Sequence, residues 1–372
     1  MATSQLFQPI TLDGLTLPNR IIIAPMCQYS AKDGRTTGWH TIHLGQLALS
    51  GAGMLIIEAT AVEPAGRISP ADLGLWSDET EHALAETLAQ VRAYSTMPIA
   101  LQIAHAGRKA STAVPWEGGA QIAPDAGGWQ TRAPSALPFD PSENPPVALT
   151  VADLTELREA FADTARRAAR AGIDAIEIHA AHGYLLHEFL SPLSNRRSDA
   201  YGGSLENRLR FPLEVFDAVR AAFPAGKPVG VRVSATDWVE GGWSLEETIA
   251  LAEALKARGC AFIHVSSGAL SLDQKIPVGP GYQVPLARAI KAATGLPTIA
   301  VGLITEPEQA ETILVSGDAD MIGLARGILY DPRWPWHAAA RLGQKIEAAP
   351  QYLRAAPHQA ADLFKVCLLY TS

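Results

Sequence analysis

The sequence predicts an α/β fold: a (β/α)8 TIM barrel in a single domain. Eight short apolar runs recur along the chain, and helical patterns separate most of them. The runs are continuous rather than alternating, as expected of parallel strands covered on both faces. A closed barrel is the simplest arrangement of eight such units, and an open doubly wound sheet is the competing one. The predicted strands are 20–24, 54–59, 98–104, 174–179, 228–234, 261–267, 296–301 and 319–325.

Several helices between these strands carry start and stop signals. Ser244 begins the sequence Ser-Leu-Glu-Glu, a capping box with Glu247 at the third position. Thr305 begins Thr-Glu-Pro-Glu in the same way, and Gly317 ends that helix. Thr150 starts a third helix, whose apolar stripe is formed by Leu154, Leu157, Phe161, Ala165 and Ala168.

The main irregular segment is 106–149, which is rich in proline and glycine and follows the third strand. A long insertion at the carboxyl end of a strand is typical of a binding site, although it can also be a tolerated surface loop. We expect one domain over 1–356 and a C-terminal tail over 357–372. The end of this tail, 366–372, is unusually apolar and is expected to be disordered or non-native.

Composition and charge narrow the class of protein. The 372 residues are 48% apolar and 18% charged, an ordinary globular balance, and the net charge of -8 argues against nucleic-acid and anionic-membrane partners. The three cysteines are scattered and form no CxxC pair, so neither a disulfide framework nor a structural metal site is expected. Without a signal-peptide pattern or an apolar run of about 20 residues, the sequence predicts a soluble, cytoplasmic protein.

Polar or glycine positions follow nearly every predicted strand. In a TIM barrel the functional side chains lie at the carboxyl ends of the strands. These positions therefore predict one large ligand contacted from all sides. In chain order they are Pro25, Met26, Cys27, Tyr29, Ala59, Thr60, Gln102, 105–109, His179, His182, Tyr184, Arg232, 266–268, Gly302 and Arg326.

The ends of the seventh and eighth strands indicate a phosphate site. Gly302 and the segment 323–326 lie where barrels often bind phosphate through backbone N–H groups. Arg326 can add a bidentate contact to the phosphate. Glycines also end strands for purely steric reasons, which is the alternative interpretation. The combination predicts a phosphorylated cofactor across the mouth of the barrel.

The sequence HAAHGY places His179, His182 and Tyr184 at the end of the fourth strand. From the residues alone, the two histidines can be metal ligands, buried core residues, or donors to a substrate oxygen. No third metal ligand is evident nearby. A metal-dependent TIM-barrel hydrolase using His179 and His182 nevertheless remains an alternative function, because two histidines at this spacing can both bind a metal.

A longer motif carries a resemblance to a known family. The segment 179–208, HAAHGYLLHEFLSPLSNRRSDAYGGSLENR, closely resembles the signature of the old yellow enzymes, and the resemblance extends over about 5–356. It points to the thermophilic-like branch, with YqjM and the xenobiotic reductases. It implies an FMN-containing barrel that uses NADPH or NADH to reduce the C=C bond of α,β-unsaturated carbonyl compounds. The other matching motifs are PMCQYS (25–30), EATAV (58–62), QIAHAGRK (102–109) and GPGYQV (279–284).

The resemblance assigns the chemistry to three side chains. It implies that His179 and His182 bind the substrate's carbonyl oxygen, where two N–H donors stabilise the charge that develops during hydride transfer. It also implies that Tyr184 protonates the α-carbon, since a phenol with a pKa near ~10 stays protonated at neutral pH. The structural alternatives are core histidines and a packing tyrosine.

The same resemblance implies the cofactor contacts. Gln102 and Arg232 would face the pyrimidine edge of the flavin, where a cation stabilises the negative charge of the reduced state. Cys27 would lie close to the flavin and touch the substrate, and Tyr29 would line the substrate pocket opposite the histidines. Many relatives have glycine where this chain has Ala325, whose methyl group can crowd the phosphate loop. The other implied cofactor contacts are Pro25, Met26, Ala59, Gly302, Ala325 and Arg326.

Arg354, in PQYLRAAP, resembles an arginine that this branch inserts into the active site of a neighbouring subunit. This implies a homodimer or homotetramer, whereas the structural alternative is a solvated surface arginine. A flavin-binding protein without relevant turnover is a further alternative to the ene-reductase.

Overall fold

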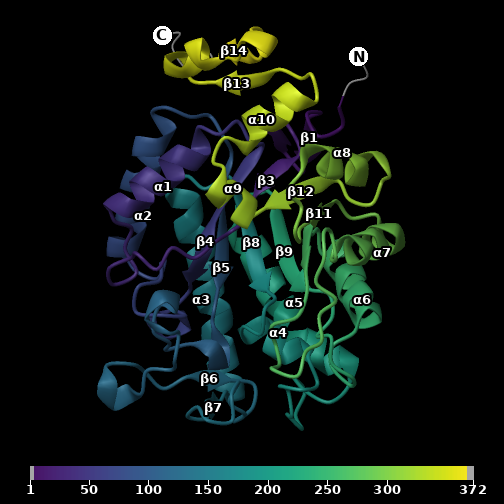
Figure 1. Ribbon diagram of the computed structural model, residues 1–372. Helices are drawn as coiled ribbons and strands as arrows, with labels where there is room; N and C mark the ends of the chain where they lie inside the picture. The colour runs from purple at the N-terminus through teal and green to yellow at the C-terminus, as the bar shows by residue number, and fades with distance from the viewer. Residues whose placement is uncertain (1–3, 367–372) are drawn as a thin grey trace.

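The computed structural model describes residues 4–366 and confirms the predicted TIM barrel (Figure 1). Eight parallel strands close in the order β10-β11-β12-β3-β4-β5-β8-β9, and the ring is complete because β9 pairs with β10. Each of the eight predicted runs coincides with one of them, and only β4 and β8 extend past the predicted end, by two residues and one residue. The strands are β3 (Ile21–Ile23), β4 (Met54–Ala61), β5 (Ile99–Ala104), β8 (Ala175–Ala180), β9 (Val229–Ser234), β10 (Ile263–Ser266), β11 (Thr298–Ala300) and β12 (Met321–Leu324).

Helices surround this barrel (Figure 1). The predicted apolar stripe after Thr150 is buried along its whole length. Within residues 4–366, none of the helices is both long and apolar enough to cross a membrane. They are α1 (Gly38–Ala48), α2 (Asp78–Arg92), α3 (Val151–Arg170), α4 (Leu185–Leu190), α5 (Leu205–Ala222), α6 (Leu245–Lys256), α7 (Val284–Thr294), α8 (Pro307–Val315), α9 (Arg326–Tyr330) and α10 (Trp334–Arg341).

Two of the three predicted helix starts are confirmed. The side chains of Thr150 and Ser244 accept hydrogen bonds from the backbone N–H three residues on, at 3.2 and 3.3 Å. The start predicted at Thr305 is wrong, because α8 begins at Pro307 and its N-cap is Glu306. A proline disfavours the helical conformation in the residue before it, so Glu306 is extended and the helix cannot begin earlier.

A short hairpin, which the strand patterns did not predict, closes the N-terminal end of the barrel. β1 (Ile10–Leu12) and β2 (Leu15–Leu17) pair antiparallel. Leu12 and Leu17 pack with side chains from inside the barrel, including Met54 and Met321, which are the first residues of β4 and β12. Apolar side chains therefore fill this end, and the opposite end is left for polar residues.

The segment 106–149 is irregular, as predicted. It contains only single helical turns and two strands of two residues each. These elements are η2 (Gly107–Lys109), η3 (Pro115–Glu117), η4 (Pro124–Ala126), β6 (Arg132–Ala133) and β7 (Val147–Ala148). Another single turn, η1 (Pro64–Gly66), follows β4.

The C-terminal segment forms a small layer of its own, at the top of Figure 1. β13 (Ile346–Ala348) pairs parallel with β14 (Phe364–Val366), and the turns η5 (Pro350–Ala355) and η6 (His358–Ala360) lie between them. The predicted tail thus includes η6 and β14. Residues 367–372, the rest of the apolar end, lie outside the described residues.

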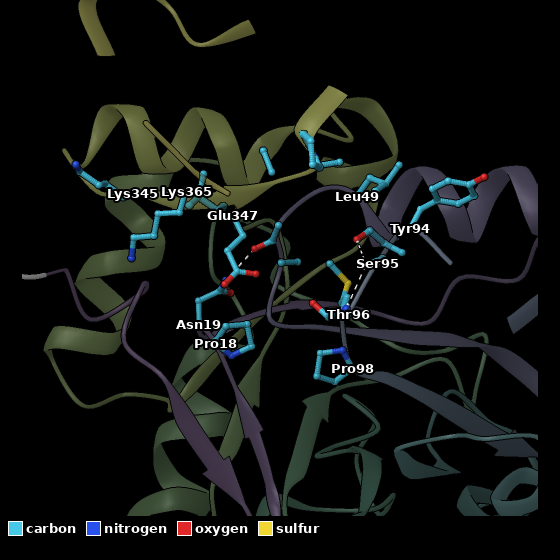
Figure 2. Close-up of a pocket in the computed structure, with 18 of the residues that line it drawn as sticks. Pro18, Asn19, Leu49, Tyr94, Ser95, Thr96, Pro98, Lys345, Glu347 and Lys365 are labelled. Carbon is cyan, nitrogen blue, oxygen red and sulfur yellow. Dashed lines mark hydrogen bonds between the residues drawn. The ribbon is translucent and has the colours of Figure 1, made fainter. Parts of the chain in front are cut away.

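A pocket of about 330 Å³ lies between this layer and the N-terminal ends of β3, β4 and β5. In Figure 2, Lys345 and Glu347 lie on one side of it, and Asn19 and Pro98 lie on the other. Asn19 donates to the carbonyl of Gly51 at 2.8 Å, so its amide N–H is satisfied within the chain. This pocket is at the end of the barrel opposite the predicted site.

Candidate active site

The structure brings His179, His182 and Tyr184 together where β8 ends. The ring of His179 meets the ring of His182 edge to face, with centroids 5.2 Å apart, and meets that of Tyr184 at 5.0 Å. His182 has a φ of 58°, in the left-handed region that is unfavourable for a side chain with a Cβ. Its backbone N–H donates to Ser234 Oγ at 2.9 Å, which helps to hold this strained turn.

Burial keeps all three side chains uncharged. It lowers the pKa of His179 and of His182 well below the usual value, and the nearby Arg232 charge lowers both further. It also raises the pKa of Tyr184 well above the usual value, so the phenol stays protonated at neutral pH. Each imidazole therefore has one N–H donor and one lone pair.

Lys109 supports the turn that carries His182. Its Nζ donates to the carbonyl of His182 at 2.9 Å and to that of Ala269 at 3.0 Å, and it lies 5.2 Å from the centre of the Tyr184 ring. Burial lowers the pKa of Lys109 to about 8. Sequence reasoning gave Lys109 only a place on the pocket rim, because its carbonyl partners lie far along the chain.

Gln102 belongs to a buried polar chain that sequence reasoning missed. Its Nε2 donates to Glu177 Oε1 at 2.7 Å, and the other oxygen of Glu177 lies 2.7 Å from His264 Nδ1. Burial alone would raise the pKa of Glu177, but His264, Arg232 and Gln102 outweigh it and lower the pKa. The available signal was a charged or titratable residue between apolar neighbours in each of two runs, Glu177 in DAIEIH and His264 in AFIHVSS.

Arg232, on β9, is a buried cation without a hydrogen-bond partner. Its side chain is 7% exposed, and its Nε bonds to no described residue. Glu177 provides a nearby negative charge, but no ion pair forms between the two side chains within residues 4–366. Because burying an unpaired guanidinium is costly, this position fits a bound molecule that presents an acceptor or a negative charge.

The segment after β3 forms another wall of the site. Cys27 and Tyr29 pack with Tyr184 around a small apolar cluster that also includes Trp129 of the insertion. Burial raises the pKa of Cys27 well above its usual value, and Asp72 and Glu58 raise it further, so the sulfur is a neutral thiol. The Tyr29 ring meets that of Trp116 edge to face at 5.8 Å.

Pro25 and Met26 begin this same segment, and Met26 packs against the main core. Ala59 lies within β4 and, with Tyr184, lines a small cavity beside the wall. The predicted cofactor contacts Pro25, Met26 and Ala59 therefore come from the first two strands of the barrel, next to Cys27.

The predicted phosphate end lies where β11 and β12 finish. Gly302 has a φ of 122°, and a Cβ there would come within 2.8 Å of Gln283 Nε2, so this position requires glycine. Ala325 is the N-cap of the short helix α9, and Arg326, its first residue, is exposed. The methyl group of Ala325 therefore lies directly before the first turn of α9.

Arg354 lies away from the site of its own chain. It is an exposed residue of η5, and the first residues of η5 line the pocket at the N-terminal end of the barrel. The site described above is at the opposite end. Arg354 therefore does not line the site of its own chain.

The geometry gives little support to the metal-site alternative. Among residues 4–366, no group of three or more histidine, cysteine or acidic side chains is arranged to hold a metal ion. One nitrogen of each histidine is also engaged: Nδ1 of His179 accepts from the backbone N–H of Ala181 at 3.3 Å, and Nε2 of His182 lies 2.7 Å from Ser266 Oγ.

Comparison with known proteins gives consistent similarities. The family model described as the NADH:flavin oxidoreductase / NADH oxidase family matches residues 5–345. An NADPH dehydrogenase of Geobacillus thermodenitrificans is 48% identical over 351 residues, covering 94% of this chain and 98% of the relative.

Two solved structures are also similar to this chain over most of its length. Morphinone reductase in complex with tetrahydroNAD is 28% identical, with a TM-score of 0.76 and coverage of 100% of both chains. The old yellow enzyme homologue from Zymomonas mobilis is 27% identical, with a TM-score of 0.75, and the match covers 92% of this chain and 94% of that one.

Proposed function

This chain belongs to the NADH:flavin oxidoreductase / NADH oxidase family, and from that membership we propose that it reduces the C=C bond of α,β-unsaturated carbonyl compounds. It is an FMN-dependent oxidoreductase with a nicotinamide electron donor, and the Geobacillus thermodenitrificans relative is named as an NADPH dehydrogenase. When bound, FMN would supply the redox chemistry, which is hydride transfer between the nicotinamide donor and the acceptor. The observation that carries the proposal is the group of two neutral histidines and one protonated tyrosine around the end of β8.

The site fits FMN through its unpartnered groups. Arg232 offers a buried positive charge to the negative pyrimidine edge of a reduced flavin, and Gln102, held by Glu177, supplies an amide. Gly302 and Arg326 would hold the phosphate, with Ala325 between β12 and α9. Pro25, Met26 and Ala59 would contact the ring system.

His179 and His182 would orient the acceptor by binding its carbonyl oxygen. Negative charge develops on that oxygen when hydride reaches the β-carbon, so N–H donors aimed at it stabilise the transition state more than the ground state. Because burial keeps both rings neutral, they donate without carrying a charge of their own.

Tyr184 would supply the proton. Its Oη keeps its proton at neutral pH and lies on the ring that contacts His179, so it can donate to the α-carbon of a substrate held by the histidines. Cys27, as a neutral thiol, and Tyr29 would line the substrate pocket, and neither would act as a nucleophile.

We also propose that the active unit is a homodimer or homotetramer in which Arg354 reaches a neighbouring active site. The support is its position on η5, away from the site of its own chain, and its exposure.

An anaerobic visible spectrum of the purified enzyme tests the function. Addition of NADPH should bleach the flavin bands, and addition of 2-cyclohexenone should restore them. Bands that bleach but do not return would leave an FMN oxidoreductase with another acceptor and would overturn the roles of the histidines and Tyr184. A protein that takes up no FMN would overturn the whole proposal.

A further inference from the structure

The feature that carries a further inference is the contact between His182 and Ser266, at the end of β10. Nε2 of His182 lies 2.7 Å from Ser266 Oγ, and its ring makes no other hydrogen bond to the described residues. Nδ1 is therefore the ring nitrogen left for a ligand. A neutral imidazole carries one proton, so Nδ1 can donate to an oxygen only if Nε2 is the unprotonated nitrogen.

The neighbours of Ser266 decide where its own proton lies. The Ser266 hydroxyl has two acceptors in reach, His182 Nε2 at 2.7 Å and Gln283 Oε1 at 3.4 Å. Gln283 Oε1 already accepts from Ser267 Oγ at 2.7 Å. The amide cannot be flipped without loss, because Gln283 Nε2 donates to the carbonyl of Val301 at 3.0 Å. If the imidazole donated instead, the Ser266 proton would be left with only the long 3.4 Å contact to Gln283 Oε1, so the geometry directs that proton to the imidazole.

We propose that Ser266 is a positioning residue that holds His182 as the Nδ1–H tautomer. His179 is held in the opposite tautomer, since its Nδ1 accepts from the backbone N–H of Ala181 and its proton is therefore on Nε2. The two rings thus present one Nε2–H and one Nδ1–H donor. This deepens the proposed function, on which it rests, because one carbonyl oxygen can accept both bonds.

The other tautomer would work against binding. With its proton on Nε2, His182 would donate to Ser266 and turn the lone pair of Nδ1 toward the substrate oxygen. Protonation of both nitrogens would also provide a donor, but it would place a cation in a buried site that already holds Arg232. The Ser266 hydroxyl therefore allows His182 to present Nδ1–H without a positive charge on its ring.

The test is ¹⁵N NMR of the FMN-bound enzyme labelled at histidine, in which protonated and unprotonated ring nitrogens have distinct shifts and couplings. Signals of His182 are assigned by their loss in His182→Gln. The wild type should show protonated Nδ1 and unprotonated Nε2 for His182, and the reverse for His179. Protonated Nε2 in His182 would overturn the proposal, and this wild-type spectrum decides the assignment even if a Ser266 variant does not fold.

Variants then test the role of the hydroxyl. Ser266→Ala should shift His182 toward the Nε2–H form and lower kcat/KM for 2-cyclohexenone by roughly 3- to 10-fold, the loss of one hydrogen bond. Ser266→Thr, which keeps the hydroxyl, should restore both. Ser50→Ala removes an equally buried hydroxyl from the N-terminal end of the barrel and should change neither.

An unchanged His182 tautomer in Ser266→Ala would overturn the role of Ser266. Correct tautomers in an enzyme that never reduces enones would support the tautomer assignment and overturn the proposed function, so the two failures are distinguishable.

Discussion

The rings of His179 and Tyr184 meet edge to face, 5.0 Å apart and inclined at 85°. Their backbones are joined by the same short turn at the end of β8. The side chain proposed to bind the substrate oxygen, His179, and the side chain proposed to donate the proton, Tyr184, are therefore held at a fixed spacing. A substrate held by its oxygen has its α-carbon at a defined place relative to the phenol, which is the arrangement that proton transfer requires.

Tyr184→Phe should slow reoxidation of reduced FMN by 2-cyclohexenone by about 10²- to 10⁴-fold, the range for loss of a general acid. Reduction of FMN by NADPH should stay nearly intact, because the ring contact with His179 remains. Stopped-flow absorbance of the two half-reactions measures this. Tyr201→Phe, which removes a phenol bonded to Glu214, is the control. Equal losses in both half-reactions would contradict the role of Tyr184.

Arg232→Gln should make the reduction potential of bound FMN more negative by about 30–60 mV, because one charge-assisted contact with the reduced flavin is lost. Arg232→Lys keeps the charge and should retain much of the potential. A spectroelectrochemical titration of each FMN-bound variant measures the shift. The role of Arg232 is refuted by a Gln variant that binds FMN at the wild-type potential.

Mixed oligomers test the position of Arg354. Arg354→Ala should raise KM for the enone, and Tyr184→Phe should remove turnover. If Arg354 serves a neighbouring site, a hybrid of the two variants contains one site with both native residues. Subunit exchange should then raise activity above the average of the two parents. Activity equal to that average, in a hybrid proven by mass spectrometry, would place Arg354 outside the neighbouring site.

Glu188, on α4, should make stability depend on pH. One of its carboxylate oxygens accepts from the backbone N–H of Arg108 at 2.8 Å, and the other has no hydrogen-bond partner among residues 4–366. Burial raises the pKa of Glu188 to about 8. The folded state therefore holds a proton that the unfolded chain loses near pH ~4.3. The stability contributed by this proton is complete below that pH and is lost as the pH rises through about 8.

Glu188→Gln cannot ionise, so it should gain stability relative to wild type between pH 6 and pH 9, by on the order of a few kcal/mol. Urea unfolding of both FMN-bound proteins at the two pH values measures the difference. Glu240→Gln, at an exposed carboxylate, is the control and should show no such gain. Parallel pH profiles for wild type and Glu188→Gln would contradict the prediction.

Most of the barrel follows from local pattern, because strands covered on both faces are continuous, mainly apolar runs that helical patterns separate. The hairpin that plugs the barrel does not follow this pattern, since its strands Ile10–Leu12 and Leu15–Leu17 alternate apolar and polar residues around the turn Asp13-Gly14 and form no continuous apolar run. The start of α8 was missed because Pro307 restricts the residue before it, which outweighs a capping motif in the sequence.

The site shows a different limit. Placement at the strand ends predicted which side chains meet, including His179, Tyr184 and Arg232. It could not predict that Glu177 holds Gln102, or that Ser266 contacts His182, because these partners are 75 and 84 residues apart along the chain. A hydrogen-bond partner inside a barrel depends on register between strands, which a single sequence does not reveal.

The strands and the irregular segment 106–149 contribute different parts of the site. The groups proposed for chemistry lie on strands or directly after them, whereas the segment supplies Trp116 and Trp129, which pack against the wall formed by Tyr29 and Cys27. Substitutions at Trp116 and Trp129 can change the shape of this wall while the reactive groups keep their positions. For a protein engineer, this makes residues 110–149 a natural place for a combinatorial library aimed at acceptor range, because the catalyst itself need not be rebuilt.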